Sequence, residues 1–199
     1  MKKINEIFHS IQGEGCHTGV PSVFIRFSGC NLKCGFCDTL HEDGKWMTDE
    51  EIIEAVKAQQ SSRIILTGGE PSLFIDSEFI KKLKAETGLP IAIETNGTRE
   101  LPEGIDWVTV SPKTGMSKTG DSEVIVKYAD ELKVVETGQD LECYFKLPCV
   151  MENTVMLLQP CYVKNENERD QNIQRTIKRV LEDPRWRLSL QVHRMIGVR

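Results

Sequence analysis

The stretch Arg63-Ile-Ile-Leu-Thr-Gly-Gly-Glu-Pro71 contains the pattern that decides the fold class. Its apolar run, 63–67, stops at two glycines, which is typical of a strand buried within a sheet. Residues 79–83 then place apolar side chains at helical spacing, and a second apolar run over 90–95 ends at an Asn-Gly turn. A strand, a helix and another strand joined by short connections predict a parallel sheet with helices outside it.

The same alternation extends along the chain in both directions. Thr48-Asp-Glu-Glu51 fits a capping box, so we expect a helix to begin there with Ile52, Ile53 and Val56 on its buried face. Further predicted strands are 22–27, 107–110, 131–135, 155–158 and 188–192. Further predicted helices are a short one over 122–129 and a longer one over 167–182, with Ile173, Ile177, Val180 and Leu181 as its apolar stripe.

The predicted fold class is α/β, with about six mostly parallel strands and a reduced set of outer helices. The 199 residues are fewer than the ~250 of a complete eightfold barrel, so we expect a partial, open β/α barrel and a single domain over 1–199. Because the carboxyl ends of parallel strands face one side, the polar motifs that follow them should surround one mouth. Those motifs are the loop 29–37 and the segments 68–71, 96–97, 111–113 and 159–160.

Composition and charge narrow the functional classes. The net charge of −5 argues against a nucleic-acid-binding surface, which needs clustered Lys and Arg. No run approaches the ~20 apolar residues of a membrane span, and the first residues lead into no secretory signal. We therefore expect a cytoplasmic protein.

Three of the seven cysteines lie within the loop Gly29-Cys-Asn-Leu-Lys-Cys-Gly-Phe-Cys37. An odd, clustered set favours metal or redox chemistry over disulfides. Cys30, Cys34 and Cys37 suit an iron–sulfur cluster, and three ligands would leave one iron open to a substrate or cofactor. His41 leaves a second interpretation open, a Cys₃His zinc site. The scattered cysteines, Cys16, Cys143, Cys149 and Cys161, fit ordinary free thiols.

The spacing Cys-x3-Cys-x2-Cys, with Phe36 before the last cysteine, resembles the signature of radical S-adenosylmethionine enzymes. In that superfamily, S-adenosylmethionine chelates the open iron of a [4Fe–4S] cluster, and the reduced cluster cleaves this cofactor to a 5′-deoxyadenosyl radical. Gly68-Gly-Glu70 resembles the turn that holds the amino group of the cofactor. The resemblance implies that Cys30, Cys34 and Cys37 are the catalytic cluster ligands. It assigns cofactor binding to Phe36, Asp38, Gly68, Gly69, Glu70, Asn96, Ser111, Pro112, Lys113 and Gln159.

Most of the chain also resembles the 7-carboxy-7-deazaguanine synthases. The segments that carry this resemblance are 10–15, 21–26, 29–39, 67–71, 94–98, 111–113, 158–160 and 191–193. It implies a carbon–nitrogen lyase that makes a queuosine precursor for tRNA modification. The substrate would be 6-carboxy-5,6,7,8-tetrahydropterin, and the products 7-carboxy-7-deazaguanine and ammonia. It also implies Mg²⁺, a flavodoxin or ferredoxin as electron donor, and a homodimer.

The same resemblance implies roles for residues of a substrate site. It assigns the substrate to Ile11, Gln12, Gly13, Glu14, Arg26 and Thr67, and Mg²⁺ to Thr39. Gln12 and Glu14 would pair with the polar edge of the pterin, and the guanidinium of Arg26 would clamp its carboxylate. Structural interpretations stay open beside these: Arg26 can reach a surface carboxylate, Glu70 can cap a helix, and 96–97 can be only a turn.

Two features leave alternatives open. Cys16-His17 stands where small or apolar residues are commoner in the family, so this thiol and imidazole either touch the substrate or have no part in binding it. The cluster motif is also shared with activases that install a glycyl radical on a partner protein. A non-enzymatic zinc module is the third interpretation.

Overall fold

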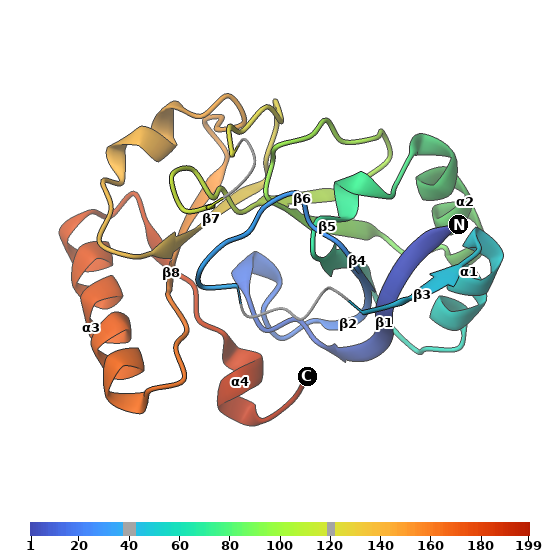
Figure 1. The fold of residues 1–199 in the computed structure, drawn as a ribbon, viewed down its shortest axis with the longest axis horizontal. Helices are drawn as coiled ribbons and strands as arrows, with labels where there is room; N and C mark the ends of the chain where they lie inside the picture. The colour runs from blue at the N-terminus through green and yellow to red at the C-terminus, as the bar shows by residue number, and fades with distance from the viewer. Residues whose placement is uncertain (38–42, 119–121) are drawn as a thin grey trace.

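The computed structural model describes residues 1–37, 43–118 and 122–199. These residues form one curved sheet, with α1 and α2 at one end of the arc and α3 at the other (Figure 1). The strands are β1 (Lys2–Ile11), β2 (Pro21–Phe27), β3 (Lys45–Met47), β4 (Ile64–Gly68), β5 (Ile91–Thr95), β6 (Trp107–Val110), β7 (Glu131–Glu136), β8 (Val155–Pro160) and β9 (Arg187–Leu188). The helices are α1 (Asp49–Lys57), α2 (Ser77–Thr87), α3 (Glu166–Glu182) and α4 (Val192–Ile196), and the 3₁₀ turns are η1 (Gly15–His17), η2 (Pro71–Leu73) and η3 (Glu142–Lys146). No helix formed by the described residues is long and apolar enough to cross a membrane.

The strand order is β3-β1-β2-β4-β5-β6-β7-β8-β9. From β2 onward each neighbouring pair is parallel, which confirms the predicted open α/β barrel. β1 and β3 are additions to the predicted strands. β1 pairs antiparallel with β2, and β3 pairs antiparallel with β1.

The antiparallel direction of β1 decides where the next segment lies. Ile4 pairs with Phe27, and Ile11 pairs with Pro21. The segment 12–20 therefore begins at the amino end of the parallel strands, whereas the cysteine loop begins after Phe27 at their carboxyl end. The two segments approach the barrel from opposite ends.

Local signals begin and end α1 and α2. Thr48 and Glu51 form the predicted capping box, with the Glu51 amide donating to Thr48 Oγ1 at 3.2 Å and the Thr48 amide donating to the Glu51 carboxylate at 2.7 Å. Asp76 caps α2 by accepting from the Phe79 amide at 2.8 Å. Gly88, with φ of 65°, ends that helix in the left-handed conformation.

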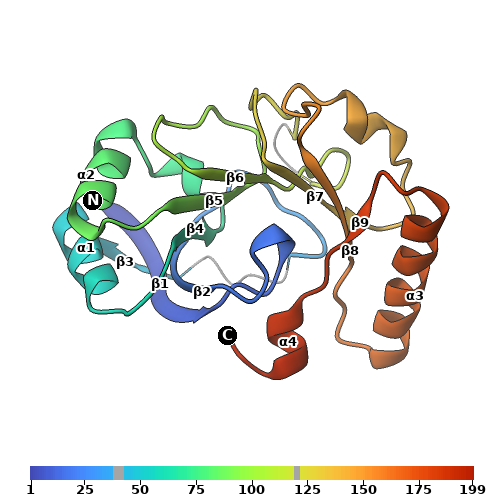
Figure 2. The same ribbon diagram turned by 180° about the vertical axis from the view of Figure 1, so that it is seen from behind.

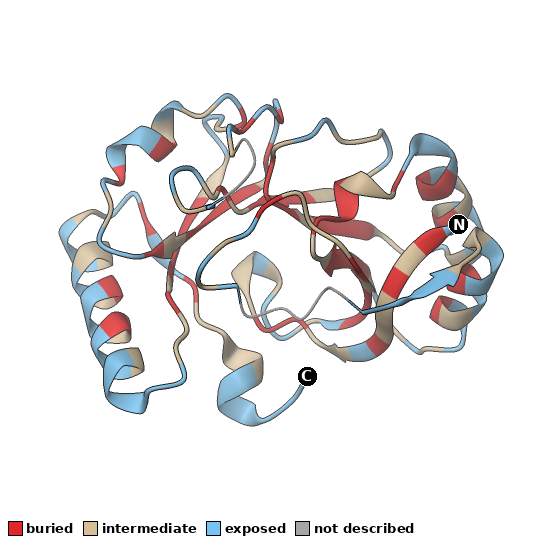
Figure 3. Ribbon diagram, in the orientation of Figure 1, coloured by how far each residue is buried: buried red, intermediate tan, exposed pale blue. Residues whose placement is uncertain are grey.

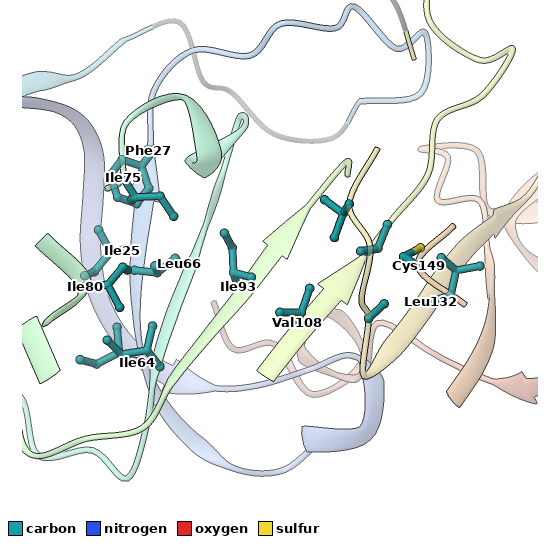
Figure 4. Close-up of a cluster of buried hydrophobic side chains, with 14 of the residues drawn as sticks. Ile25, Phe27, Ile64, Leu66, Ile75, Ile80, Ile93, Val108, Leu132 and Cys149 are labelled. Atoms are coloured by element: carbon teal, nitrogen blue, oxygen red, sulfur yellow. The ribbon is translucent and has the colours of Figure 1, made fainter. Parts of the chain in front are cut away.

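The core lies between the sheet and the inner faces of α1 and α2 (Figure 3). The predicted apolar stripes of both helices are buried. The shared cluster includes Ile25, Phe27, Ile64, Leu66, Ile80, Ile93, Val108, Leu132 and Cys149 (Figure 4). Full burial of one such aliphatic side chain contributes about 1.5–3 kcal/mol, so this cluster holds the helices to the sheet.

Charged side chains help to attach α3 to the sheet. Ile173, Ile177 and Val180 of its predicted apolar stripe are partly buried, whereas Leu181 is 79% exposed, so the prediction is wrong for Leu181. Arg175 and Arg179 donate to the carboxylate of Glu136 on β7, at 2.5 and 2.9 Å. Glu136 is fully buried, and the two guanidinium groups compensate its charge.

Residues 122–129 form no helix, contrary to the sequence prediction. Val124 and Val126 are buried while Ile125 between them is exposed, which is the alternation of an extended segment. The amides of Ile125 and Val126 both donate to the carbonyl of Gly97. Three consecutive β-branched side chains favour this extended conformation over a helix.

The predicted last strand, 188–192, is wrong in its extent. β9 comprises only two residues, and after it the amide of Ser189 donates to the carbonyl of Leu158 on β8. The amide of Val192 donates instead to the carbonyl of Gly13 at 2.9 Å, where α4 begins. The segment 191–199 therefore runs from β9 toward β1, across the open side of the barrel (Figure 2).

Candidate active site

A cavity of about 560 Å³ lies within the curved sheet. Its lining draws on the segment after β1, the cysteine loop, the ends of β4 to β8 and the segment 191–199. The predicted site residues that line it are Ile11, Gln12, Gly13, Glu14, Arg26, Cys30, Cys34, Phe36, Cys37, Thr67, Gly68, Gly69, Asn96, Ser111, Lys113 and Gln159. Residues predicted to hold the cluster, the cofactor and the substrate therefore share one cavity.

Other predicted site residues do not belong to this lining. Glu70 and Pro112 are buried behind it. Asp38, Thr39 and His41 lie outside the described residues.

The carboxylate of Glu70 braces the cavity from behind. It accepts from Thr95 Oγ1 at 2.7 Å, from the Ser72 amide at 3.1 Å and from the Asn96 amide at 2.7 Å. Glu70 thus caps η2, the structural role that the sequence left open. It also fixes Asn96, whose Nδ2 donates to Asn31 of the cysteine loop at 3.0 Å.

The Gly-Gly turn lies directly against the cysteine loop. The Glu70 amide donates to the carbonyl of Gly29 at 2.9 Å. A Cβ on Gly69 would lie 2.0 Å from that carbonyl oxygen, and Gly68 has a φ of 121°, which only glycine adopts readily. The backbone of the Gly-Gly turn can therefore approach the backbone of residues 27–29 this closely only because both positions are glycine.

The three clustered cysteines open into the cavity. Burial raises the pKa of Cys30 and of Cys34, and the neighbouring thiols act in the same direction. Lys113 opposes this shift at Cys34, although burial lowers the pKa of Lys113 itself. The loop alone therefore does not favour the thiolate forms of Cys30 and Cys34, whereas coordination to a metal does.

Three thiols on one loop at a cavity fit the donor set of a [4Fe–4S] cluster with one open iron. Among the residues that the structure describes, no three His, Cys, Asp or Glu side chains surround a site for a single metal ion. The zinc alternative depends on His41, which lies outside those residues.

Lys113 and Gln159 stand at the ends of β6 and β8. The ammonium of Lys113 donates to the carbonyl and the hydroxyl of Ser111, at 2.7 and 2.6 Å. The side-chain oxygen of Gln159 accepts from Ser189 Oγ at 3.0 Å. Both side chains are thus held in place at the cavity wall.

Glu14 is the most strongly perturbed acid of the cavity. Its carboxylate accepts from the ammonium of Lys133, and from Nε2 of Gln191 at 2.8 Å. Burial opposes ionisation, but Lys133 outweighs it and lowers the pKa of Glu14 to about 2. This side chain is therefore a hydrogen-bond acceptor at any physiological pH.

Glu94 of β5 provides a second carboxylate on the same wall. It accepts from Nε2 of Gln12 at 3.0 Å and from Oγ1 of Thr67 at 2.8 Å. Lys133 lies 3.7 Å from it. Two predicted substrate-binding residues are thus oriented by an acid that the site prediction did not include.

Arg26 contacts a carboxylate of the protein. Its Nε donates to Glu6 at 2.9 Å, and its guanidinium lies 5.5 Å from the ring centroid of Phe8. Glu6 also accepts from Arg199, which lies over the same ring. The two arginines therefore share one acid at the edge of the cavity.

Several lining residues were not among the predicted site residues: Glu94, Lys133, Val135, Tyr162, Gln191, His193, Arg194 and Arg199. Lys133 interrupts an apolar strand, which is a signal visible in the sequence. Glu94, Gln191 and His193 stand in segments that carried the family resemblance.

Cys16 and His17 do not line the cavity. The Cys16 amide donates to Glu131 at 2.8 Å, and the ring of His17 packs edge-on against Trp107 with centroids 4.4 Å apart. Burial, with the carboxylate of Glu131, raises the pKa of Cys16 to about 12. This thiol stays protonated and supports the turn after Gly13.

Comparison with known proteins decides the family. Residues 24–144 match the family model of the radical SAM superfamily, where SAM is S-adenosylmethionine. A 7-carboxy-7-deazaguanine synthase of Bacteroides thetaiotaomicron is 53% identical over 199 residues, which covers 100% of both chains. The chain belongs to the 7-carboxy-7-deazaguanine synthase family.

Other relatives agree with this membership. The 7-carboxy-7-deazaguanine synthase of Haemophilus influenzae is 34% identical and covers 98% of this chain and 93% of its own. The crystal structure of QueE from Escherichia coli matches with a TM-score of 0.77 and 28% identity, over 96% of this chain and 94% of that one. Membership of this family and of the radical SAM superfamily implies an iron–sulfur cluster and S-adenosylmethionine as cofactors.

Proposed function

We propose that this chain converts 6-carboxy-5,6,7,8-tetrahydropterin to 7-carboxy-7-deazaguanine with release of ammonia. The observation that carries the proposal is the single cavity shared by three clustered cysteines and the acceptor wall of Glu14 and Glu94. The reaction balances without an external oxidant, because ammonia accounts for the nitrogen and the hydrogens by which substrate and product differ.

The cysteine loop is the proposed cluster site. Cys30, Cys34 and Cys37 would hold the [4Fe–4S] cluster, and with S-adenosylmethionine it would supply the radical chemistry that removes a hydrogen atom from C6 of the pterin. The residues proposed to bind the cofactor are Phe36, Asp38, Gly68, Gly69, Asn96, Ser111, Pro112, Lys113 and Gln159. Glu70 would contribute from behind, by fixing the Asn96 backbone.

The substrate is proposed to lie against the segment after β1. Ionised Glu14 would accept from the amino and ring N–H groups of the pterin, beside Ile11 and the backbone of Gly13. Gln12 and Thr67, both held by Glu94, would complete this edge. Arg26 would bind the substrate carboxylate with the guanidinium nitrogens that do not face Glu6.

Further components belong to the same proposal. Mg²⁺ would bind at Thr39, with waters and the substrate carboxylate completing an octahedral shell. A flavodoxin or ferredoxin would deliver the electron, and two copies of the chain would form a homodimer. The reducing cytoplasm suits free cluster-binding thiols.

The test starts from anaerobically purified protein, analysed for iron, sulfide and zinc. About four irons and four sulfides per chain are expected, with a brown colour that dithionite bleaches. The reduced protein is then incubated with S-adenosylmethionine and the carboxy-tetrahydropterin, and the deazaguanine and ammonia are quantified. Omission of Mg²⁺, and the variant Thr39→Val, test the metal proposal.

Two results would contradict the proposal. Cleavage of S-adenosylmethionine without formation of any deazaguanine would contradict the synthase assignment and favour an activase. One zinc per chain and no sulfide would return the three cysteines to a structural role.

A further inference from the structure

Lys133 lies within the acceptor wall although the strand around it is apolar. Its neighbours Leu132 and Val134 are fully buried in the core. Its own side chain is 7% exposed and lines the cavity. A buried ammonium ion is unfavourable unless nearby carboxylates compensate it, so its partners are informative.

Two carboxylates from different segments compensate Lys133. Its Nζ donates to Glu14, which follows β1, and lies 3.7 Å from Glu94 of β5. Gln191 extends the network through Glu14, and Gln12 extends it through Glu94. One ammonium thus joins both acids of the wall.

Other charged groups act on this pair, from β7 itself and from neighbouring elements. Glu131 of β7 adds negative charge near Lys133, and Lys113 after β6 adds positive charge. His193 of α4 acts on Glu14. These charges are of mixed sign, so the direct contact between Lys133 and Glu14 decides the balance.

The balance favours the ionised form of both partners. Burial alone would lower the pKa of Lys133, yet Glu14 and Glu94 raise it well above its usual range. The reciprocal effect keeps the pKa of Glu14 low despite burial.

We propose that Lys133 is a positioning residue whose ammonium pairs with Glu14 and Glu94 and fixes both carboxylates, so that the wall accepts hydrogen bonds and selects the 2-amino-4-oxo edge of a pterin. The inference rests on the proposed function, whose substrate carries adjacent N–H donors on that edge. A carboxylate has no proton to donate. The 2-oxo analogue, a lumazine, would set a carbonyl oxygen against it, and such unpaired polar groups discriminate strongly between ligands.

The test compares the binding of 6-carboxypterin and 6-carboxylumazine, followed by ligand fluorescence under anaerobic conditions without turnover. The wild-type protein should prefer the pterin. Lys133→Met should weaken pterin binding at neutral pH by at least about 30-fold, the low end for removing one partner of a buried charge pair. It should also lose the preference, because a protonated Glu14 can donate to the 2-oxo group. Lys133→Arg keeps the charge and should retain the preference.

The pH profile separates this role from simple packing. In the wild type Glu14 stays ionised, so its own titration should cause no change in pterin affinity between about pH 5 and pH 8. Without the ammonium, burial raises the pKa of Glu14, so the affinity of Lys133→Met should increase with pH. Lys133→Gln keeps hydrogen-bond donors without charge and should show the same profile, even if the Met variant does not fold. Lys82→Met, which removes an exposed ion pair with Glu50, is the matched control.

A flat profile with unchanged preference in Lys133→Gln or Lys133→Met would overturn this role. Wild-type protein that binds neither ligand would instead overturn the proposed function, and this inference with it. The two failures are therefore distinguishable.

Discussion

The imidazole of His193 packs directly on the backbone of Gly13. A Cβ at position 13 would lie 2.1 Å from Nδ1 of that ring. The neighbouring Val192 amide donates to the Gly13 carbonyl at 2.9 Å. The segment 191–199 therefore packs on the proposed substrate-binding turn through a contact that only glycine permits. The position of this segment across the open side of the barrel thus depends on the conformation of that turn.

Gly13→Ala should displace this segment. Overpacking of this kind costs about 1–3 kcal/mol, and here the segment can move away. We expect a higher KM for the pterin and faster hydrogen exchange of the amides in 192–198. The double variant Gly13→Ala/His193→Gly removes the clash and should recover the exchange protection. Unchanged exchange in the single variant would show that the segment is not seated on Gly13.

Gly69→Ala should disturb the cysteine loop. The new Cβ would meet the Gly29 carbonyl at 2.0 Å, so we expect a loss of about 1–3 kcal/mol or more in the free energy of unfolding. Iron and sulfide content should fall with it. The matched control is Gly35→Ala in the same loop, where the nearest atom, on Lys118, is 4.0 Å from the Cβ. Equal cluster loading in both variants would contradict the argument.

The cluster ligands should be separable from the other thiols. Alanine at Cys30, Cys34 or Cys37 should abolish bound iron, sulfide and activity together. Cys149→Ala should leave all three unchanged, because Cys149 lies in the apolar core. This substitution should lower only the free energy of unfolding, by about 1 kcal/mol, through lost packing. Metal analysis with a visible spectrum decides this, and cluster loss in Cys149→Ala would show that the ligands are misassigned.

Acid should loosen α3 through Glu136. Burial opposes its ionisation, but Arg175 and Arg179 outweigh it and lower its pKa below the usual value. A lowered folded-state pKa gives stability that is present above the usual pKa of 4.5 and lost as the pH falls through the lowered value. Glu136→Gln should therefore cost about 2 kcal/mol at neutral pH and flatten the acid limb of the unfolding curve.

The control for that experiment is Glu142→Gln, which removes an exposed ion pair with Arg185. We expect its thermal unfolding to follow the wild-type pH profile, since exposed pairs contribute little. A wild-type acid limb in Glu136→Gln would show that other carboxylates govern acid stability.

The parallel strands β2 and β4 to β8 could be predicted because most of their residues are buried and their sequences are largely apolar. β1 has no such apolar sequence. Lys2 occupies a core-facing position there, where its ammonium pairs with Asp49 at 2.6 Å and lies over the ring of Phe79. A charged residue at a buried position interrupts the apolar–polar alternation by which the strand could be predicted. On α3 the buried positions are the polar Asn172 and Thr176, and Asn172 donates to the Cys161 carbonyl at 2.9 Å. Such partners are distant in the chain and leave no periodic signal.

The parts of the site that are formed by loops directly after strands could be predicted from the sequence. The cysteine spacing and the Gly-Gly turn are local patterns, and the structure places their cavity-lining members together. Glu94 and Lys133 belong to the wall only because β5 and β7 bring them beside the segment after β1. That meeting depends on the direction of β1, which no local pattern specifies.

The two chain ends meet at the cavity, and both lie outside the stretch that matches the superfamily. Gln12, Glu14 and the segment 191–199 lie outside the stretch 24–144 that matches the superfamily, whereas the cysteine loop and the Gly-Gly turn lie inside it. The stretch that matches the superfamily is thus bracketed by two segments that contact each other through the Val192 amide and the Gly13 carbonyl. Transplanting both ends together from a relative should therefore keep this contact, whereas either end alone would meet a foreign partner.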